Sequence, residues 1–140
     1  MNANVRLIVE LGRSLIGIPY KYAVPPEEIG IYFDCSSFVQ HIFRHINAEL
    51  PRSTILQATK GAEVENLNAV QAGDLIFFRG TKGHYNDELF PDRPVYIGHV
   101  AVYTENNKAL HAAQETGVIE EPIEKILEKR EPIVIIKRLL

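Results

Sequence analysis

The fold is decided by residues 34–46, which read DCSSFVQHIFRHI. Apolar residues recur in this stretch with the period of an α-helix, at Cys35, Phe38, Val39, Ile42, Phe43 and Ile46. Asp34 stands directly before them and is a favoured N-cap residue. The pattern therefore predicts a helix over residues 35–47, which carries the only cysteine of the chain in its first turn.

Three more helices are predicted by similar signals. Residues 5–16 have an amphipathic spacing that ends at Gly17. A shorter helix capped by Ser53 runs to about Lys60. Residues 122–130 form the last helix, with a proline in its first turn.

The second half of the chain predicts short strands, because β-branched and apolar runs alternate there with turn residues. These strands span residues 74–78, 97–103, 109–113, 117–120 and 133–138. Helices followed by strands favour an α+β fold with an antiparallel sheet. The connection over residues 79–96 is long for a compact domain, and we expect either a functional loop or a mobile one.

Length and composition bound the function. The 140 residues fit one domain, residues 1–140, and the single cysteine excludes an internal disulfide. A net charge of -3 argues against dedicated nucleic-acid binding, and no apolar run reaches the roughly 18 residues of a membrane span. We expect a monomer that neither binds nucleic acid nor spans a membrane and that uses no cofactor.

The compartment stays unknown at this stage. Residues 1–6 lack the charged and apolar regions that begin a signal peptide. The chain as given would act in the cytoplasm, unless a leader was removed or a non-standard export route is used.

Cys35 has two interpretations. In the first turn of a helix it meets the positive end of the helix dipole, which favours a reactive thiolate. A free cysteine is also among the residues most often buried, so a structural role is the alternative. Other residues have to decide between the two.

His99 and His111 lie on neighbouring predicted strands, at an even separation in the sequence. A loop over residues 104–106 would pair Tyr103 with Asn107 and place His99 directly opposite His111. The Cβ atoms of such a pair lie about 4.5–5.5 Å apart, so the two rings could hydrogen-bond. With Cys35 this gives a nucleophile, a base and an orienting residue, although two half-buried structural histidines are the alternative.

The same pairing divides the hairpin into two faces. One face is apolar and consists of Val100, Val102, Leu110 and Ala112. The other holds His99 and His111 among small residues, Ala101, Ala109 and Ala113. Small neighbours leave room for the end of a helix to approach the histidines.

Over roughly residues 5–120 the chain resembles the NlpC-type papain-like cysteine peptidases, bacterial enzymes that cut cell-wall peptides. The matching segments, in the order of the family, are Gly17-Ile18-Pro19-Tyr20, Phe33-Asp34-Cys35-Ser36-Ser37-Phe38-Val39, Leu50-Pro51-Arg52-Ser53, Ala72-Gly73-Asp74-Leu75-Ile76-Phe77-Phe78, Gly98-His99-Val100-Ala101-Val102-Tyr103 and Ala109-Leu110-His111-Ala112. The resemblance implies a papain-like fold in which the helix of the nucleophile packs on an antiparallel sheet.

The resemblance also implies a chemistry and a substrate. Cys35 would be the nucleophile, His99 the general base, and His111 the residue that fixes the tautomer of His99. The implied reaction is hydrolysis of amide bonds in peptidoglycan stem peptides or related peptides through a thioester. The implied bond joins γ-D-glutamate to a diamino acid.

Five further residues match family positions near the substrate. Tyr20 matches a tyrosine whose hydroxyl helps to hold the oxyanion. Asp34 and Ser36 match positions that bind the free amine end of the stem peptide, although N-capping alone explains Asp34 equally well. Arg52 and Ser53 match a motif near the pocket.

No metal site is expected. His41 and His45 lie four positions apart, but without the glutamate of a metallopeptidase motif they fit a solvated helix face. A zinc site built from Cys35, His99 and His111 would lack a fourth protein ligand.

Several features leave the function open. Glu120, Glu121 and the charged residues 124–131 indicate an exposed helix without catalytic geometry. Residues 22–28 and the 79–96 connection differ from the family pattern and flank the expected groove. The alternatives are a cysteine amidase or acyltransferase on a substrate outside the cell wall, and a catalytically silent binding module.

Overall fold

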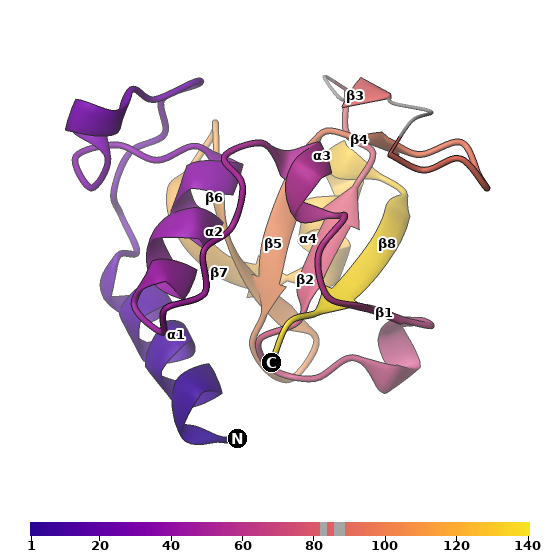
Figure 1. Ribbon diagram of the computed structural model, residues 1–140. Coiled ribbons are helices and arrows are strands. Elements are labelled where there is room, and N and C mark those ends of the chain that lie inside the picture. The colour runs from indigo at the N-terminus through magenta and orange to yellow at the C-terminus, as the bar shows by residue number, and fades with distance from the viewer. Residues whose placement is uncertain (82–83, 86–88) are drawn as a thin grey trace.

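The computed structural model describes residues 1–81, 84–85 and 89–140 (Figure 1). Its main feature is a six-stranded antiparallel sheet in the order β1-β8-β2-β5-β6-β7. The strands are β1 Ala62–Val64, β2 Leu75–Phe78, β5 His99–Tyr103, β6 Lys108–Ala113, β7 Gly117–Pro122 and β8 Ile133–Arg138. The expected α+β class with an antiparallel sheet is confirmed.

Helices cover both faces of this sheet (Figure 1). The α-helices are α1 Ala3–Ser14, α2 Cys35–Arg44, α3 Thr54–Gln57 and α4 Ile123–Arg130, and short 3-10 helices span η1 Pro26–Glu28 and η2 Leu67–Ala69. α1 and α2 lie side by side on one face and bury Ile8, Phe38 and Ile42 against it. α4 packs on the opposite face through Ile123 and Ile126.

Successive side chains of β5 and β6 point to opposite faces of the sheet, and this explains how the two faces differ. Val100, Val102, Leu110 and Ala112 belong to the core under α1 and α2, whereas Ala101 and Ala109 belong to the core under α4. The predicted division of the hairpin into two faces is thus confirmed for these residues. None of the helices in the described ranges is long and apolar enough to cross a membrane.

The N-terminus of α2 is fixed by a reciprocal cap. The carboxylate of Asp34 accepts the backbone N–H of Ser37 at 2.8 Å, and the Ser37 hydroxyl accepts the backbone N–H of Asp34 at 2.9 Å. These bonds satisfy donors that the first turn of a helix leaves unpaired. Asp34 was predicted as the N-cap from the sequence. It fixes the start of α2 and therefore places Cys35 in the first turn.

Several predicted boundaries are wrong in instructive ways. The helix after Ser53 ends at Gln57 rather than near Lys60. The strand predicted over residues 97–103 is divided, because Gly98 leaves the ladder between β4 Tyr96–Ile97 and β5. β4 turns away from the main sheet and pairs with β3 His84–Tyr85. Residues 82–83 and 86–88 of the long predicted connection lie outside the described residues.

The predicted register of the β5–β6 hairpin is also wrong. Tyr103 pairs with Ala109 instead of Asn107, because the loop takes in residues 104–108 rather than 104–106. Asn106 and Asn107 both adopt positive φ there, at 51° and 63°, and asparagine tolerates this conformation. His99 is therefore not directly opposite His111, but a shift of two residues keeps both side chains on the same face.

Candidate active site

Cys35 lies at the start of α2, where the helix meets β5 and the segment around Tyr20. Cys35 is only 8% exposed, so its sulfur is largely enclosed. It nevertheless lines pockets on both of its sides. One, of about 400 Å³, also contains His99 and Tyr20; the other, of about 450 Å³, contains Tyr20, Asp34 and Arg52.

The histidines form a hydrogen-bonded pair beside this cysteine. Nε2 of His99 lies 2.8 Å from Nδ1 of His111, and the two rings are nearly perpendicular, at 85°. Both residues are buried, His111 completely. Within the described ranges, Nδ1 of His99 has no hydrogen-bond partner and is the ring nitrogen left for the pocket that Cys35 lines.

A carboxylate completes the row of polar groups. Oε1 of Glu121, on β7, lies 3.0 Å from Nε2 of His111. The prediction that Glu121 lies on an exposed helix is wrong, because Glu121 belongs to β7 and its side chain is only 21% exposed. The sequence did contain a signal for Glu121. The loop over residues 114–116 has an odd number of residues, so His111 and Glu121, which are an even number of residues apart, lie on one face of the β6–β7 hairpin.

The resting charges of Cys35 and His99 differ from those expected for a thiolate. Burial raises the pKa of the Cys35 thiol, more than the Thr54 hydroxyl and nearby backbone N–H groups lower it. Burial, together with the neighbouring His111, holds the pKa of His99 well below its usual 6.5. A helix dipole contributes about 0.3–1 kcal/mol, whereas burying an ion costs several. At neutral pH the pair is therefore a thiol and a neutral imidazole.

Tyr20 is held between β7 and the strand-like segment before Cys35. The backbone N–H of Gly17 donates to the carbonyl of Val118 at 2.9 Å, and the N–H of Val118 donates to the carbonyl of Ile18 at 2.9 Å. On the other side, Tyr20 forms a β-bridge with Phe33. Burial raises the pKa of the Tyr20 phenol to about 12, with a smaller contribution from nearby Cys35. The hydroxyl thus remains a hydrogen-bond donor beside the sulfur.

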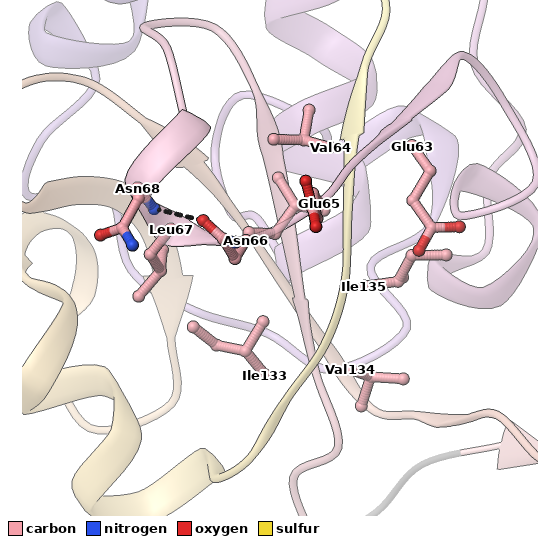
Figure 2. A pocket seen from close by; sticks show the side chains of 10 residues that line it. Glu63, Val64, Glu65, Asn66, Leu67, Asn68, Ile133, Val134 and Ile135 are labelled. Atoms are coloured by element: carbon pink, nitrogen blue, oxygen red, sulfur yellow. Dashed lines mark hydrogen bonds between the residues drawn. The ribbon is translucent and has the colours of Figure 1, made fainter.

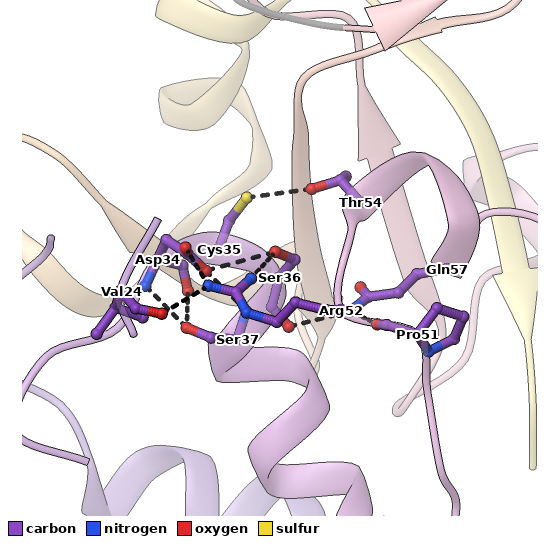
Figure 3. A network of polar contacts seen from close by, with 9 residues as sticks. All are labelled: Val24, Asp34, Cys35, Ser36, Ser37, Pro51, Arg52, Thr54 and Gln57. Carbon is purple, nitrogen blue, oxygen red and sulfur yellow. Dashed lines mark hydrogen bonds and ion pairs between the residues drawn. The ribbon is translucent and has the colours of Figure 1, made fainter. Parts of the chain in front are cut away.

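Asp34, Ser36 and Arg52 form a connected cluster on the other side of Cys35 (Figure 3). Arg52 donates to the carboxylate of Asp34 at 2.6 Å, to the Ser36 hydroxyl at 2.7 Å and to the carbonyl of Val24 at 3.2 Å. Burial raises the pKa of Asp34, but Arg52 and the cap donors outweigh it and keep the carboxyl ionised.

The segment after Arg52 supports the same helix end. Ser53 caps α3 and accepts the N–H of Leu56 at 3.4 Å, and it lines the pocket with Asp34. The Thr54 hydroxyl lies 3.6 Å from Sγ of Cys35 (Figure 3). Gln57 donates to the carbonyls of Ser36 and Pro51 and so ties α3 to the start of α2. The contact of Thr54 with the sulfur was missed, because it depends on how α3 packs against α2.

Other polar groups do not add to this site. A separate pocket of about 430 Å³ lies between residues 63–68 and 133–136 and contains neither cysteine nor histidine (Figure 2). The rings of His41 and His45 meet edge-to-face with centroids 5.1 Å apart, and His45 is exposed. In the described part of the chain, no cluster of three or more His, Cys, Asp or Glu residues could hold a metal.

Comparison with known proteins assigns the chain to a family. The model of the NlpC/P60 family matches residues 17–135. The chain belongs to the NlpC/P60 family. The match covers all eight of the residues that the sequence analysis singled out as site residues, from Tyr20 to His111.

Individual relatives match shorter parts of the chain. The murein DD-endopeptidase MepS/murein LD-carboxypeptidase of Escherichia coli (strain K12) is 40% identical over 88 residues, 61% of this chain and 39% of that protein. The gamma-D-glutamyl-L-lysine dipeptidyl-peptidase of Bacillus subtilis (strain 168) is 32% identical over 113 residues, 81% of this chain and 33% of that protein. This chain thus spans well under half of either relative.

A solved structure agrees with the fold. The NlpC/P60 family protein from Bacillus cereus ATCC 10987 is similar with a TM-score of 0.76 and 25% identity, over 97% of this chain and 40% of that one. The papain-like arrangement implied by the sequence resemblance is therefore present, with the helix of the cysteine packed on the antiparallel sheet.

Proposed function

We propose that this protein is a cysteine peptidase that hydrolyses amide bonds in peptidoglycan stem peptides. The observation that carries the proposal is the placement of Cys35 and His99 on one pocket, with His99 hydrogen-bonded to His111 at 2.8 Å. The names of the E. coli and B. subtilis relatives support a cell-wall peptide as substrate.

The chemistry follows from the neutral resting pair. Nδ1 of His99 takes the thiol proton as Sγ of Cys35 attacks the carbonyl carbon, which gives a tetrahedral oxyanion. Backbone N–H groups at the start of α2 and the Tyr20 hydroxyl are the nearby donors for this oxyanion. His99 then protonates the leaving amine, and a thioester remains on Cys35.

Hydrolysis of the thioester returns the enzyme to its starting state. His99, neutral again, accepts a proton from water as the water oxygen attacks the thioester carbonyl. The C–S bond breaks, the peptide leaves as a carboxylic acid, and the proton held by His99 returns to the Cys35 sulfur. Nδ1 of His111 accepts a hydrogen bond from the Nε2–H of His99 throughout and holds the His99 ring in one orientation.

The pocket with Asp34 would bind the acyl part of the substrate. The carboxylate of Asp34 and the hydroxyl of Ser36 offer acceptors to a free amine, with Arg52 and Ser53 as supporting residues. Tyr22, Pro25 and Pro26 form an apolar side of the same pocket. We propose a γ-D-glutamyl–diamino acid bond as the target, as in the name of the B. subtilis relative, whereas the E. coli relative is named for other bonds.

Digestion of purified peptidoglycan, with product masses read by mass spectrometry, tests the proposal. The expected products are stem-peptide fragments cut after γ-D-glutamate, which the Cys35→Ala variant does not form. Since removing a thiol leaves little empty volume, this variant should lose only about 1 kcal/mol of stability. Fragments cut at another amide bond would correct the bond alone. Turnover of acyl esters without any cell-wall product would favour the acyltransferase alternative, and no turnover of either would favour a silent module.

A further inference from the structure

The mechanism above leaves one contact of the histidine pair unused, the hydrogen bond between Glu121 and His111. Oε1 of Glu121 lies 3.0 Å from Nε2 of a His111 ring that is fully buried. The Glu121 side chain is 21% exposed, so the carboxylate is partly in contact with solvent whereas the His111 ring that it binds is not. The contact lies one ring beyond the proposed general base.

The neighbouring glutamates pair differently. Glu120 accepts two bonds from Arg13, each 2.9 Å long, and Glu115 accepts two from Arg130, at 2.9 and 3.0 Å. Within the described ranges, the only hydrogen bond of the Glu121 side chain is to His111. The carboxylate thus contacts the histidine pair directly, and Arg130 acts on it only as a more distant charge.

The carboxylate restricts where the proton of His111 sits. The hydrogen bond to His111 lowers the pKa of Glu121, so the carboxyl is ionised at neutral pH and can only accept. Nε2 of His111 must then carry the proton. In the neutral ring, Nδ1 of His111 is an acceptor, and it accepts a hydrogen bond from the Nε2–H of His99, 2.8 Å away. His99 is left with an unprotonated Nδ1.

We propose that Glu121 is a positioning residue that sets the proton arrangement of the catalytic histidines. Through His111 it keeps Nδ1 of His99 free to accept the proton of the Cys35 thiol. The same carboxylate stabilises the positive charge that develops on the two rings after that transfer. This inference rests on the proposed function, because it assumes that His99 is the base.

Glu121→Gln is the informative substitution, because it keeps the shape and removes the charge. The side-chain amide of glutamine can donate as well as accept, so His111 is no longer confined to the Nε2-protonated form. On soluble stem peptides we expect kcat to fall about 10-fold to 100-fold, as for loss of the partner that orients a metal-binding histidine. KM should stay essentially unchanged. Glu121→Asp, which keeps the charge, should recover part of the loss.

Glu120→Gln is the matched control. Glu120 is the adjacent residue, but its carboxylate binds Arg13 and Thr104 rather than a histidine. It should lower stability and leave kcat unchanged. If Glu121→Gln also changes stability alone, with kcat equal to that of Glu120→Gln, Glu121 is a structural residue and the inference is overturned.

A readout without turnover separates this inference from the proposed function. In ¹⁵N-histidine-labelled protein at neutral pH, we expect both rings to carry their proton on Nε2, and Glu121→Gln to increase the Nδ1-protonated form of His111. Unchanged tautomers in Glu121→Gln would overturn the inference whatever the activity. Failure of the proposed function would appear instead as full turnover by Cys35→Ala, with the tautomer effect of Glu121 intact.

Discussion

Nε2 of His99 lies 2.8 Å from Nδ1 of His111, so one ring can act on the substrate only in the orientation that the other allows. In the proposed mechanism, His99 would carry the proton between Cys35 and the leaving amine, and His111 would hold His99 in place without transferring that proton. We expect His99→Ala to lower kcat/KM at least by the factor of about 10²–10⁴ typical of a general acid–base residue. His111→Ala should cost less, about 10-fold to 100-fold.

Steady-state kinetics on stem peptides measures this difference. His45→Ala is the control, because His45 is exposed on the far end of α2 and should leave the rate unchanged. Equal losses in His99→Ala and His111→Ala would contradict the assignment of His99 as the base.

The pH dependence of kcat/KM should reflect the buried pair. The pKa of His99 lies well below 6.5, so its base form persists into mildly acidic solution and activity is lost only at lower pH. The pKa of Cys35 is raised above 9.0, so the alkaline limit also moves outward. We therefore expect a plateau that includes pH 6.5, with an alkaline limb above that of an ordinary thiol.

His111→Ala should move the acidic limb of this profile. Burial is the largest cause of the lowered His99 pKa and His111 is the next, and the substitution relieves both. The residual activity of the variant should therefore decline at a higher pH than that of the wild type. An acidic limb that stays in place would show that His111 does not act on the titration of His99.

Asp34→Asn distinguishes capping from substrate binding. Asparagine is as good an N-cap as aspartate, so the variant should keep α2 and fold. It loses the charge that would bind a free amine, and we expect KM to rise about tenfold, equivalent to about 1.4 kcal/mol, for stem peptides with a free N-terminus. N-acetylated peptides provide the comparison, since their KM should not change. Equal effects on the two peptides would show that Asp34 does not bind the free amine and serves only to cap α2 and to pair with Arg52.

Gly117→Ala should destabilise the protein and displace Tyr20. Gly117 has φ of 75°, and a Cβ there would lie 2.5 Å from the backbone oxygen of Ile18. Positive φ costs about 1–2 kcal/mol and overpacking a further 1–3 kcal/mol or so. Chemical denaturation should show the sum, and kcat/KM should fall with it.

Gly17→Ala is the control for this prediction. Gly17 also has positive φ, at 100°, but a Cβ there would meet nothing within 4 Å. It should show the backbone cost alone, about 1–2 kcal/mol. Equal losses in the two variants would mean that the close approach of Gly117 to Ile18 is not important.

Local signals explain what the sequence predicted well. Asp34 caps the helix it precedes, and Cys35 begins that helix, because both depend on a few neighbouring residues. The common face of His99 and His111 was also predictable, since it depends only on whether the hairpin loop is odd or even. Their direct opposition was not, because the loop is longer than residues 104–106 and uses positive φ at two asparagines.

The missed features depend on a strand boundary and on tertiary packing. The predicted strand ended at Glu120, whereas β7 continues to Pro122, so Glu121 was not counted among the strand residues on the face of His111. The pKa of the Cys35 thiol is raised by burial, which depends on how distant parts of the chain pack around the sulfur, and the hydrogen bonds from Thr54 and Val100 lower it only in part. The predicted thiolate considered the helix end and not this burial.

The most direct test of the account is to look for the acyl-enzyme on Cys35. Turnover of a soluble stem peptide is stopped with acid, and the intact protein and its Cys35 peptide are weighed by mass spectrometry. The account predicts an added mass equal to the acyl fragment of the substrate, located on Cys35 and absent from Cys35→Ala. Formation of the same products with no adduct on the wild type, and at an unchanged rate by Cys35→Ala, would contradict it.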